Sequence, residues 1–392
     1  MRILFYRYGS ICEPDIIYGF QELGNEVTEI TVEIENKNFL PKDGIKLLKK
    51  ELLSHSYDFI FSINFYPFIS EVCNIFQIRY ICWTVDCPVL ELYSDSIQNK
   101  WNRIFLFDAA QYQTFHYRNP DCIFHLPLAS NPNRWNAVIQ NASVSDKKRF
   151  SCELSFVGSL YTEKCPYDNL ANAPDYLLGY LDGIMDVQQK VYGFSFLEEV
   201  LSDEIVNKFR SCHRNFYVPP EKSIRDDRAI MAQFYLGAKI SSNERIHLMK
   251  LLGNHYPFRL YTGSNTADLP IQNHGRVKTL TEMPLVFNNS KINLNITSKS
   301  IRTGLPLRVY DVLACGGFLI TNYQSELTDY FMPGSDLECY TSDEDLLTKI
   351  DYYLTHEKDR QEIAHNGLMK IIRYHNYPER LLQMISLAYG LK

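Results

Sequence analysis

Short apolar runs that alternate with amphipathic stretches constrain the fold of this chain more than any other feature. In the first part of the sequence these runs cover residues 3–6, 27–32, 57–63, 78–84, 104–107 and 123–126. Helical patterns over residues 14–23 and 40–54 lie between the first of them. Short runs separated by helices are typical of βαβ units in a mainly parallel sheet. The pattern predicts a Rossmann-like domain over residues 1–150.

The alternation restarts at LSFVG, residues 154–158, and predicts a second Rossmann-like domain over residues 151–376. Its other strands are expected at 258–262, 292–296, 318–320 and 337–340, and late helices at 343–354 and 358–373. A helical insertion is expected at about 163–253, with helices at 176–200, 203–210 and 244–252. The last helix, in 377–392, is expected to pack back on the first domain. The fold class is therefore α/β, with two Rossmann-like domains facing a cleft.

Composition narrows the functional classes. A chain of 392 residues exceeds the size of most single cores, and 45% hydrophobic with 22% charged residues is typical of globular proteins. The net charge of −6 argues against nucleic-acid binding. No stretch is long enough for a membrane span, the N-terminus does not resemble a signal peptide, and the ten cysteines form no C-x-x-C pair. We expect a reduced, cytoplasmic protein without structural metal, with a homodimer left open.

The stretch RTGLPLRVYDVLACGGFLITN, residues 302–322, is the most informative part of the chain for function. It predicts a loop, a short helix with Pro306 at its first position, a Gly-Gly stop and a buried strand. Arg308 and Asp311 are three apart and share a helix face. A helix N-terminus that follows a glycine-containing loop and carries an arginine can bind an anion. An ordinary loop–helix–strand unit with a surface Arg–Asp pair explains the same residues.

Twin Rossmann-like domains suggest a nucleotide ligand, because open α/β sheets bind ligands beyond the carboxyl ends of their strands. The residues after the first strand, RYGSICE, hold one glycine and lack the G-x-G-x-x-G fingerprint, and the chain has no Walker A sequence. Binding of NAD or FAD as a cofactor is therefore not expected. No other cofactor is predicted.

Three blocks of the sequence resemble the CgeB-like glycosyltransferases, a bacterial group with the two-domain GT-B fold. The first is SICEPDIIYGFQELGNEV, followed later by WTVDCP and HLPLASNP; the second is LSFVGSLY. The third extends from KINLNITSKSIRTGLPLRVYDVLACGGFLITN to HEKDRQEIAHNG and YHNYPERL. The resemblance covers most of the chain outside residues 165–240. It implies transfer of a sugar from a nucleotide-diphosphate-sugar, a co-substrate such as a UDP-sugar, to a glycan, protein or small-molecule hydroxyl acceptor.

The resemblance also implies which residues bind the donor. The diphosphate would lie at the helix N-terminus after the Gly-Leu-Pro loop with Arg308 as counter-cation, and Asp311 would accept from the ribose hydroxyls. Thr303 stands where many retaining relatives carry an acid, so inverting and retaining transfer both stay open. The predicted donor-binding residues are Gly158, Ser159, Thr262, Gly263, Val277, Arg302, Thr303, Gly304, Leu305, Pro306, Arg308 and Asp311.

Inverting transfer needs a base at the end of a strand in the first domain. Three acids follow such strands: Glu13, Asp15 and Asp86. A helix first-turn role explains Asp15 equally well, and a turn role explains Asp86. The Asp-x-Asp sequence Asp343-Glu344-Asp345 could suggest a metal clamp, but Ser342 before it indicates helix capping, so no metal site is predicted.

Two other functions remain open from the sequence. A nucleotide-sugar 2-epimerase can use the same pair of domains and would convert its substrate without an acceptor. A non-catalytic partner that binds a nucleotide-sugar and supports another transferase is the second alternative, and Thr303 in place of an acid favours it.

Overall fold

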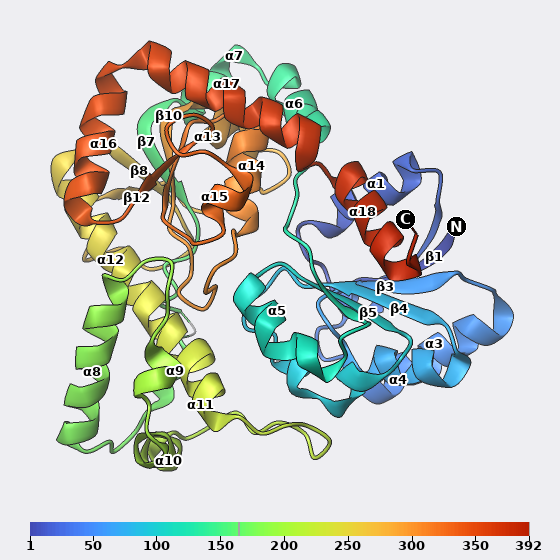
Figure 1. Cartoon of the computed structure of the whole chain (residues 1–392). Coiled ribbons are helices and arrows are strands. Elements are labelled where there is room, and N and C mark those ends of the chain that lie inside the picture. Colours follow the sequence, from blue (N-terminus) through green and yellow to red (C-terminus); the bar gives the residue numbers. More distant parts are fainter. Residues whose placement is uncertain (164, 392) are drawn as a thin grey trace. The chain divides into compact units, whose positions relative to one another are not determined.

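The computed structural model describes residues 1–163 and 165–391. It contains two compact units: unit 1 is Met1–Ala129, Val218–Arg225 and Tyr374–Lys392, and unit 2 is Ser130–Tyr217 and Asp226–Arg373. Residues 164 and 392, which fall in the expected insertion and in the expected terminal segment, lie outside the described residues. Each unit contains one six-stranded sheet whose paired strands are all parallel (Figure 1).

Unit 1 has the strand order β2-β1-β3-β4-β5-β6. Its β3 has the sequence FIFSI and is buried along its whole length, as expected for a parallel strand covered on both faces. Its strands are β1 (Arg2–Tyr6), β2 (Glu26–Ile30), β3 (Phe59–Ile63), β4 (Arg79–Trp83), β5 (Asn102–Leu106) and β6 (Ile123–His125). Its helices are α1 (Glu13–Glu22), α2 (Val32–Glu35), α3 (Pro41–Ser54), α4 (Pro67–Phe76), η1 (Leu90–Tyr93), η2 (Asp95–Gln98), α5 (Ala109–Phe115), η3 (His116–Arg118) and α18 (Tyr377–Tyr389).

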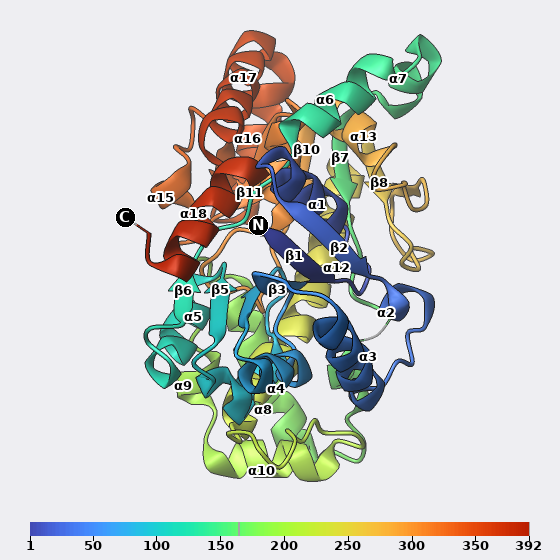
Figure 2. The ribbon, with the colours of Figure 1, turned by 90° about the vertical axis from the view of Figure 1, so that its right-hand side faces the viewer.

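Two segments from later in the sequence complete unit 1. Helix α18 packs beside α1, while α3 and α4 pack together on the opposite face of the sheet (Figures 1 and 2). Tyr377 at the start of α18 meets the buried Trp83 ring edge-on, with centroids 6.2 Å apart. Residues 218–225 pair with the turn after η1, where the Ile224 N–H donates to the Tyr93 carbonyl at 2.9 Å.

Unit 2 has the strand order β12-β11-β10-β7-β8-β9. Its strands are β7 (Cys152–Val157), β8 (Phe258–Tyr261), β9 (Gln272–Asn273), β10 (Ser290–Asn295), β11 (Leu319–Asn322) and β12 (Glu338–Tyr340). Its helices are α6 (Pro132–Asn141), α7 (Val144–Phe150), η4 (Pro166–Asn169), α8 (Asp175–Gln189), α9 (Leu197–Val200), α10 (Asp203–Cys212), α11 (Asp227–Ile230), the π-helix η5 (Met231–Leu236), α12 (Gly237–His255), α13 (Met283–Asn289), α14 (Leu307–Ala314), α15 (Leu327–Tyr330), α16 (Asp343–Thr355) and α17 (Glu357–Tyr374).

The core of unit 2 lies between its sheet and three long helices. Strand residues such as Phe156, Leu260 and Leu294 pack against Leu248 of α12 and Ile350 of α16, and α17 adds Ile363 and Ala364. Helices α13 and α14 contact β10 and lie on the other side of the sheet (Figure 1). The sheet is therefore covered on both faces, and polar side chains gather where its strands end.

The structure corrects several expected boundaries. Val32 begins α2 instead of ending a strand, and Pro306 precedes the first residue of α14 by one position. The helix expected over 176–200 is interrupted after Gln189, where Gly193 has φ +75° and lies so close to Tyr323 that a Cβ would be 2.7 Å from its ring. The division between units falls at 129/130 instead of near 150, because α6 and α7 pack on α13.

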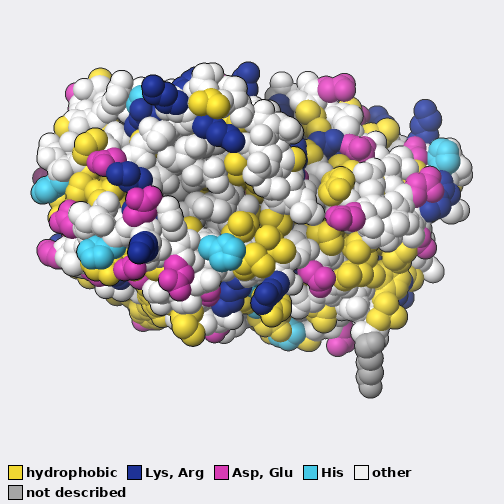
Figure 3. All heavy atoms as spheres, turned by 90° about the horizontal axis from the view of Figure 1, so that it is seen from above, with side chains coloured by type: hydrophobic (Ala, Val, Ile, Leu, Met, Phe, Trp, Pro, Cys, Tyr) yellow, Lys and Arg dark blue, Asp and Glu magenta, His cyan; other side chains and the backbone are white. Residues whose placement is uncertain are grey.

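Two surface properties follow from the described residues. Basic and acidic side chains are interspersed on the face in Figure 3, which agrees with the small net charge of −6. Within the described ranges, the helices all fall short of the length and hydropathy that a membrane span requires.

Gly367 of α17 tests how closely this helix packs. A Cβ at Gly367 would lie 2.3 Å from the Asp336 carbonyl oxygen and 2.8 Å from Leu313 Cδ2. Gly367→Ala should therefore lower the unfolding free energy by about 1–3 kcal/mol despite the better helix propensity of alanine. Gly179→Ala in α8 is the matched control, because nothing lies within 4 Å of its Cβ position; it should be neutral or stabilise by about 0.5–1 kcal/mol. Equal melting temperatures for the two variants would contradict the close packing.

Candidate functional site: the strand ends of the two sheets

The strand order of unit 2 reverses between β7 and β10. Counted in chain order, the sheet reads 6-5-4-1-2-3, so its first and fourth strands are neighbours. The crossovers from these two strands leave toward opposite faces of the sheet, which opens a crevice at their carboxyl ends where α/β proteins bind nucleotides. Gly158 and Ser159 follow β7, and Thr297 follows β10. The predicted phosphate-binding residues Gly158 and Ser159 therefore lie at this switch point.

Arg245 of α12 occupies the switch point. Its guanidinium donates to the carbonyl oxygens of Ser159 and Ile296, each at 2.5 Å, and so joins the ends of β7 and β10. The ring of Tyr161 covers it, with the guanidinium carbon 4.3 Å from the ring centroid. Tyr161 has φ +59°, a left-handed conformation that is uncommon for an aromatic residue and that collects at ligand sites.

The electrostatic state of Arg245 favours an anion. Its partners above are neutral carbonyl groups, and its Nε has no hydrogen-bond partner among the described residues. A guanidinium offers five donors and stays charged. Sequence reasoning missed Arg245, because it lies within a helix after the insertion and outside any recognisable motif.

Arg308 lies at the start of α14, as predicted, and contacts α13. Its Nη1 is 2.8 Å from the Met283 sulfur, and its guanidinium carbon is 5.1 Å from the Phe287 ring centroid. Burial lowers the pKa of Arg308, and the charge of Arg245 lowers it further, against the opposing effect of Asp311. An anion near both guanidiniums would offset the effect of Arg245 and favour the charged form of Arg308.

The Gly-Leu-Pro loop before α14 is held by hydrogen bonds to backbone carbonyls at its start. The Gln324 amide donates to the Gly304 carbonyl at 3.1 Å, and the Glu326 N–H donates to the Thr303 carbonyl at 3.2 Å. Leu305 is buried, and Pro306 caps α14. Arg302 is directed to Glu198 of α9, with Nη1 and Oε1 3.6 Å apart. The loop thus forms a fixed approach to the helix N-terminus.

Asp311, expected to bind ribose, is buried and accepts a hydrogen bond from the Ser130 hydroxyl at 2.7 Å. Ser130 also accepts from the Trp135 indole at 2.9 Å. Asp311 therefore joins α14 to the segment before α6 in this structure. Ribose binding would require a ligand to share this carboxylate with Ser130.

The end of β8 adjoins a cavity of about 320 Å³ lined by Ser159, Tyr161, Glu163, Cys165, Ala238 and Arg276. A Cβ at Gly263 would be 2.0 Å from Arg276 Nε, so this close approach requires glycine. Hydrogen bonding from Ser264 lowers the pKa of Glu163, and Arg276 contributes. Thr262 is buried and closes a turn with Ser264, and Val277 follows Arg276 in irregular structure. Ser159 and Arg276 thus face one cavity, whereas the Thr262 side chain is structural.

Glu13 does not have the surroundings of a base. Its side chain is 0% exposed, is 3.0 Å from Arg7 Nε, and accepts from the N–H groups of Tyr8 and Gly9 at 2.9 and 3.1 Å. These bonds fix the turn between β1 and α1. Asp15 is also buried, in the first turn of α1. The structure therefore corrects the expectation for both acids, since neither presents a carboxylate to an acceptor.

Asp86 is exposed and lies at the switch point of unit 1, where the order 2-1-3 brings the ends of β1 and β3 together. Asn64, with φ +58°, donates to Asp86 at 2.7 Å and accepts from the Val85 N–H at 3.1 Å. The Tyr8 hydroxyl lies 3.4 Å from the same Asp86 oxygen. Tyr8, Asn64 and Asp86 follow β1, β3 and β4, respectively. The sequence pattern did not indicate Tyr8 or Asn64 as site residues.

The Asp-x-Asp sequence begins α16. The Ser342 hydroxyl accepts from the Asp345 N–H at 3.1 Å, which confirms helix capping. Asp343 pairs with His247 at 2.5 Å.

Comparisons with known proteins agree with this geometry. Residues 238–386 match the model of a glycosyl transferase-like family. Solved structures with the same fold include HepE from Anabaena in complex with UDP-glucose, at 10% identity over 100% of both chains with a TM-score of 0.56. A UDP-forming α,α-trehalose-phosphate synthase from Burkholderia xenovorans matches at 12% identity over 100% of this chain and 99% of that one, with a TM-score of 0.55.

A glycosyltransferase from Rickettsia africae ESF-5 matches at 10% identity over 100% of this chain and 98% of that one, with a TM-score of 0.53. A search of curated proteins found no match. The chain thus shares its fold with these structures, which confirms the predicted α/β fold with two parallel sheets, and its residues 238–386 match the glycosyl transferase-like model.

Glu13 and Asp86 can be distinguished by stability. Glu13→Ala removes the buried carboxylate that accepts from the Tyr8 and Gly9 N–H groups and leaves Arg7 paired with Glu29 alone, so the unfolding free energy should fall by about 1–3 kcal/mol. Asp86→Ala removes an exposed carboxylate and should change it by less than about 1 kcal/mol. Chemical denaturation followed by circular dichroism measures both. A Glu13→Ala variant as stable as the wild type would contradict the structural role of Glu13.

Proposed function

We propose that this protein is a CgeB-like glycosyltransferase that moves a sugar from a nucleotide-diphosphate-sugar to a hydroxyl acceptor without a metal ion. The observation that carries the proposal is Arg245 at the β7–β10 switch point, where its guanidinium is held by two backbone carbonyls. Its charge also contributes to lowering the pKa of the buried Arg308. This arrangement suits an anion at the place where the fold binds nucleotides.

The donor diphosphate is the anion that this geometry supports best. Its oxygens would accept from Arg245, from Arg308 and from the N–H groups at the start of α14. The cavity of about 320 Å³ with Arg276 on its wall would take the base. We propose a uridine donor, since HepE was solved with UDP and with UDP-glucose.

Charge stabilisation explains why a metal is not required in this proposal. When the bond from the sugar to the diphosphate breaks, negative charge grows on the leaving oxygen. Preorganised guanidiniums and helix N–H groups stabilise such charge without reorganisation. Arg245 is preorganised by its two carbonyl partners, and Arg308 by α13.

Asp86 is the proposed base for the acceptor hydroxyl. It is exposed, and its hydrogen-bond partners Asn64 and Tyr8 orient it at the strand ends of unit 1. Nearby, Glu33 accepts from the Tyr6 hydroxyl at 2.7 Å. A strand edge that offers carboxylates and tyrosines suits a hydroxyl-bearing acceptor such as a glycan. Deprotonation by Asp86 would accompany attack with inversion at the anomeric carbon.

Donor binding tests the arginine site. Arg245→Met and Arg308→Ala should each weaken UDP binding by about 1.5–3 kcal/mol, or roughly 10- to 150-fold, because each removes a charge-assisted contact. Arg373→Ala, which changes an exposed arginine of α17, is the matched control and should bind as the wild type does. Isothermal titration in EDTA measures the affinities. Unchanged affinity in both site variants would remove the arginines from the donor site, and a need for Mg²⁺ would contradict the metal-independent part.

Turnover tests Asp86. Asp86→Asn keeps the size of the side chain and should lower kcat by about 10²–10⁴-fold while UDP affinity stays unchanged, because only the proton acceptor is lost. Release of UDP with and without an acceptor panel measures the rate. A variant with wild-type kcat would exclude Asp86 as the base. Conversion of the UDP-sugar without any acceptor would instead favour the epimerase.

A further inference from the structure

The loop after β10, residues 297–304, is fastened to the helical insertion. We call these residues the donor loop. The Lys299 N–H donates to the Ser241 hydroxyl at 2.8 Å, and the Ser300 hydroxyl donates to the Gln233 carbonyl at 2.8 Å. Both partners belong to the helical stretch formed by η5 and α12. The position of the loop is thus set by helical residues that precede their loop partners by 58 and 67 positions in the chain.

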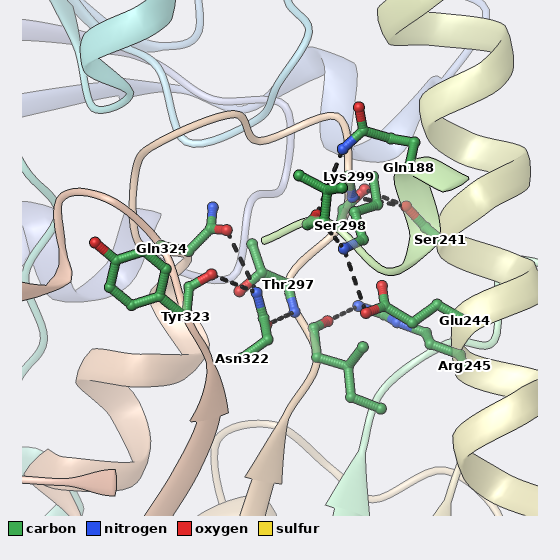
Figure 4. A network of polar contacts seen from close by, with 12 residues as sticks. Gln188, Ser241, Glu244, Arg245, Thr297, Ser298, Lys299, Asn322, Tyr323 and Gln324 are labelled. Atoms are coloured by element: carbon green, nitrogen blue, oxygen red, sulfur yellow. Dashed lines mark hydrogen bonds and ion pairs between the residues drawn. The ribbon is translucent and has the colours of Figure 1, made fainter. Parts of the chain in front are cut away.

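The side chain of Lys299 makes a further attachment, to a buried carboxylate. Its Nζ is 3.5 Å from Glu244 Oε1, and the two side chains are 8% and 2% exposed. The same Nζ donates to the Val191 carbonyl at 3.2 Å and lies 3.9 Å from the Tyr192 ring centroid. Figure 4 shows Lys299 between Ser298 and Glu244. Lys299 therefore joins the loop to α12 and to the segment that links α8 with α9.

Gly237, which follows the π-helix directly, provides room for the contact with Ser300. A Cβ at Gly237, the first residue of α12, would be 2.8 Å from Ser300 Oγ and 3.3 Å from Ser300 Cα and N. The backbone of the loop therefore lies directly on the helix where the π-helix ends. π-Helical turns inside α-helices are frequent at functional sites.

A second ion pair fastens the far end of the loop. Arg302 is 3.6 Å from Glu198 of α9, and the Gln233 amide donates to the same Glu198 oxygen at 2.6 Å. Glu198 thus contacts both the loop and the π-helix. The insertion reaches the loop through three segments: α9, the α8–α9 link, and the stretch formed by η5 and α12.

We propose that the helical insertion anchors the donor loop, and that Lys299 is the positioning residue that transmits this anchoring. The inference rests on the proposed function where it concerns the donor, because the loop leads directly into Gly304 and the start of α14. By holding residues 297–304, the insertion places Arg308 and the α14 N-terminus for the diphosphate. Lys299 acts through the loop and needs no contact with the substrate.

The chemistry of the Lys299–Glu244 pair fits positioning better than stabilisation. Burial lowers the pKa of Lys299 and raises that of Glu244, so each group is desolvated and depends on the other for its charge. A buried pair of this kind contributes little net stability, but its loss leaves an uncompensated charge. Displacement of Lys299 is therefore disfavoured, which restricts the loop to one position.

Hydrogen–deuterium exchange of the donor loop tests the anchoring without any ligand. In Lys299→Met, exchange of residues 297–304 should be at least tenfold faster than in the wild type. Lys349→Met is the matched control, because Lys349 pairs with Glu338 and Asp345 at 3.3 Å in the same unit and away from the loop. It should leave loop exchange unchanged. Gly237→Ala, which changes no charge, should also accelerate loop exchange. Loop exchange within twofold of wild type in both Lys299→Met and Gly237→Ala would overturn the proposal.

Titration with UDP tests whether the anchored loop serves the donor. Lys299→Met should bind UDP at least tenfold more weakly than wild type, and Lys349→Met should bind it equally well. Faster loop exchange with unchanged UDP affinity would overturn the positioning role. If the wild type itself binds no UDP, the proposed function fails, whereas the exchange experiment still decides whether the insertion holds the loop.

Discussion

The reversal of strand order in a parallel sheet is the constraint on which the site depends. Neighbouring β7 and β10 send their crossovers to opposite faces, so their carboxyl ends are left open to a ligand. Arg245 enters this opening and uses two of its donors on the carbonyls of Ser159 and Ile296. Its Nε has no hydrogen-bond partner among the described residues. A site of this kind favours an anionic ligand, whatever the rest of the substrate is.

Placement of the second arginine depends on a longer chain of contacts. Arg308 follows the donor loop, and the loop is held by Lys299, Ser300 and Arg302 against the insertion. The insertion therefore holds the donor loop, a role that its amino-acid composition does not indicate. Its helices do not extend the sheet. Polar groups of Gln233, Ser241 and Glu244 instead bind the loop that leads to α14. A buried ion pair such as Lys299–Glu244 adds little to the free energy of unfolding but fixes the positions of the groups that it joins. A site with two like charges requires such fixed positions.

Features that depend on residues close together in the sequence were predictable, whereas features that depend on contacts between distant residues were not. The Gly316 stop with φ +68°, the Ser342 cap and all strands except the two-residue β9 were predictable, because each depends on neighbours in the sequence. The burial of Glu13 depends on the turn that it closes around Arg7, which the sequence does not display. Arg245 belongs to the site only because α12 passes beneath the ends of two strands from distant parts of the chain. Such tertiary placement leaves no local pattern.

The contrast between Glu13 and Asp86 shows why placement decides chemistry. Both acids follow a strand at the same edge of one sheet, and from the sequence they are equivalent. Glu13 is buried and paired with the Arg7 guanidinium and two N–H groups, so its carboxylate is already occupied within unit 1. Asp86 is held by the neutral Asn64 amide and lies near the Tyr8 hydroxyl, so it is oriented without a paired cation among these contacts. The cations of the proposed site, Arg245 and Arg308, belong to helices of unit 2, where they would stabilise the leaving diphosphate. A cation paired with a general base would compete with the proton that the base must accept, and the base would neutralise the cation that must stabilise the leaving group. Asp86 and the two arginines belong to different units, so these two roles are kept apart in the chain.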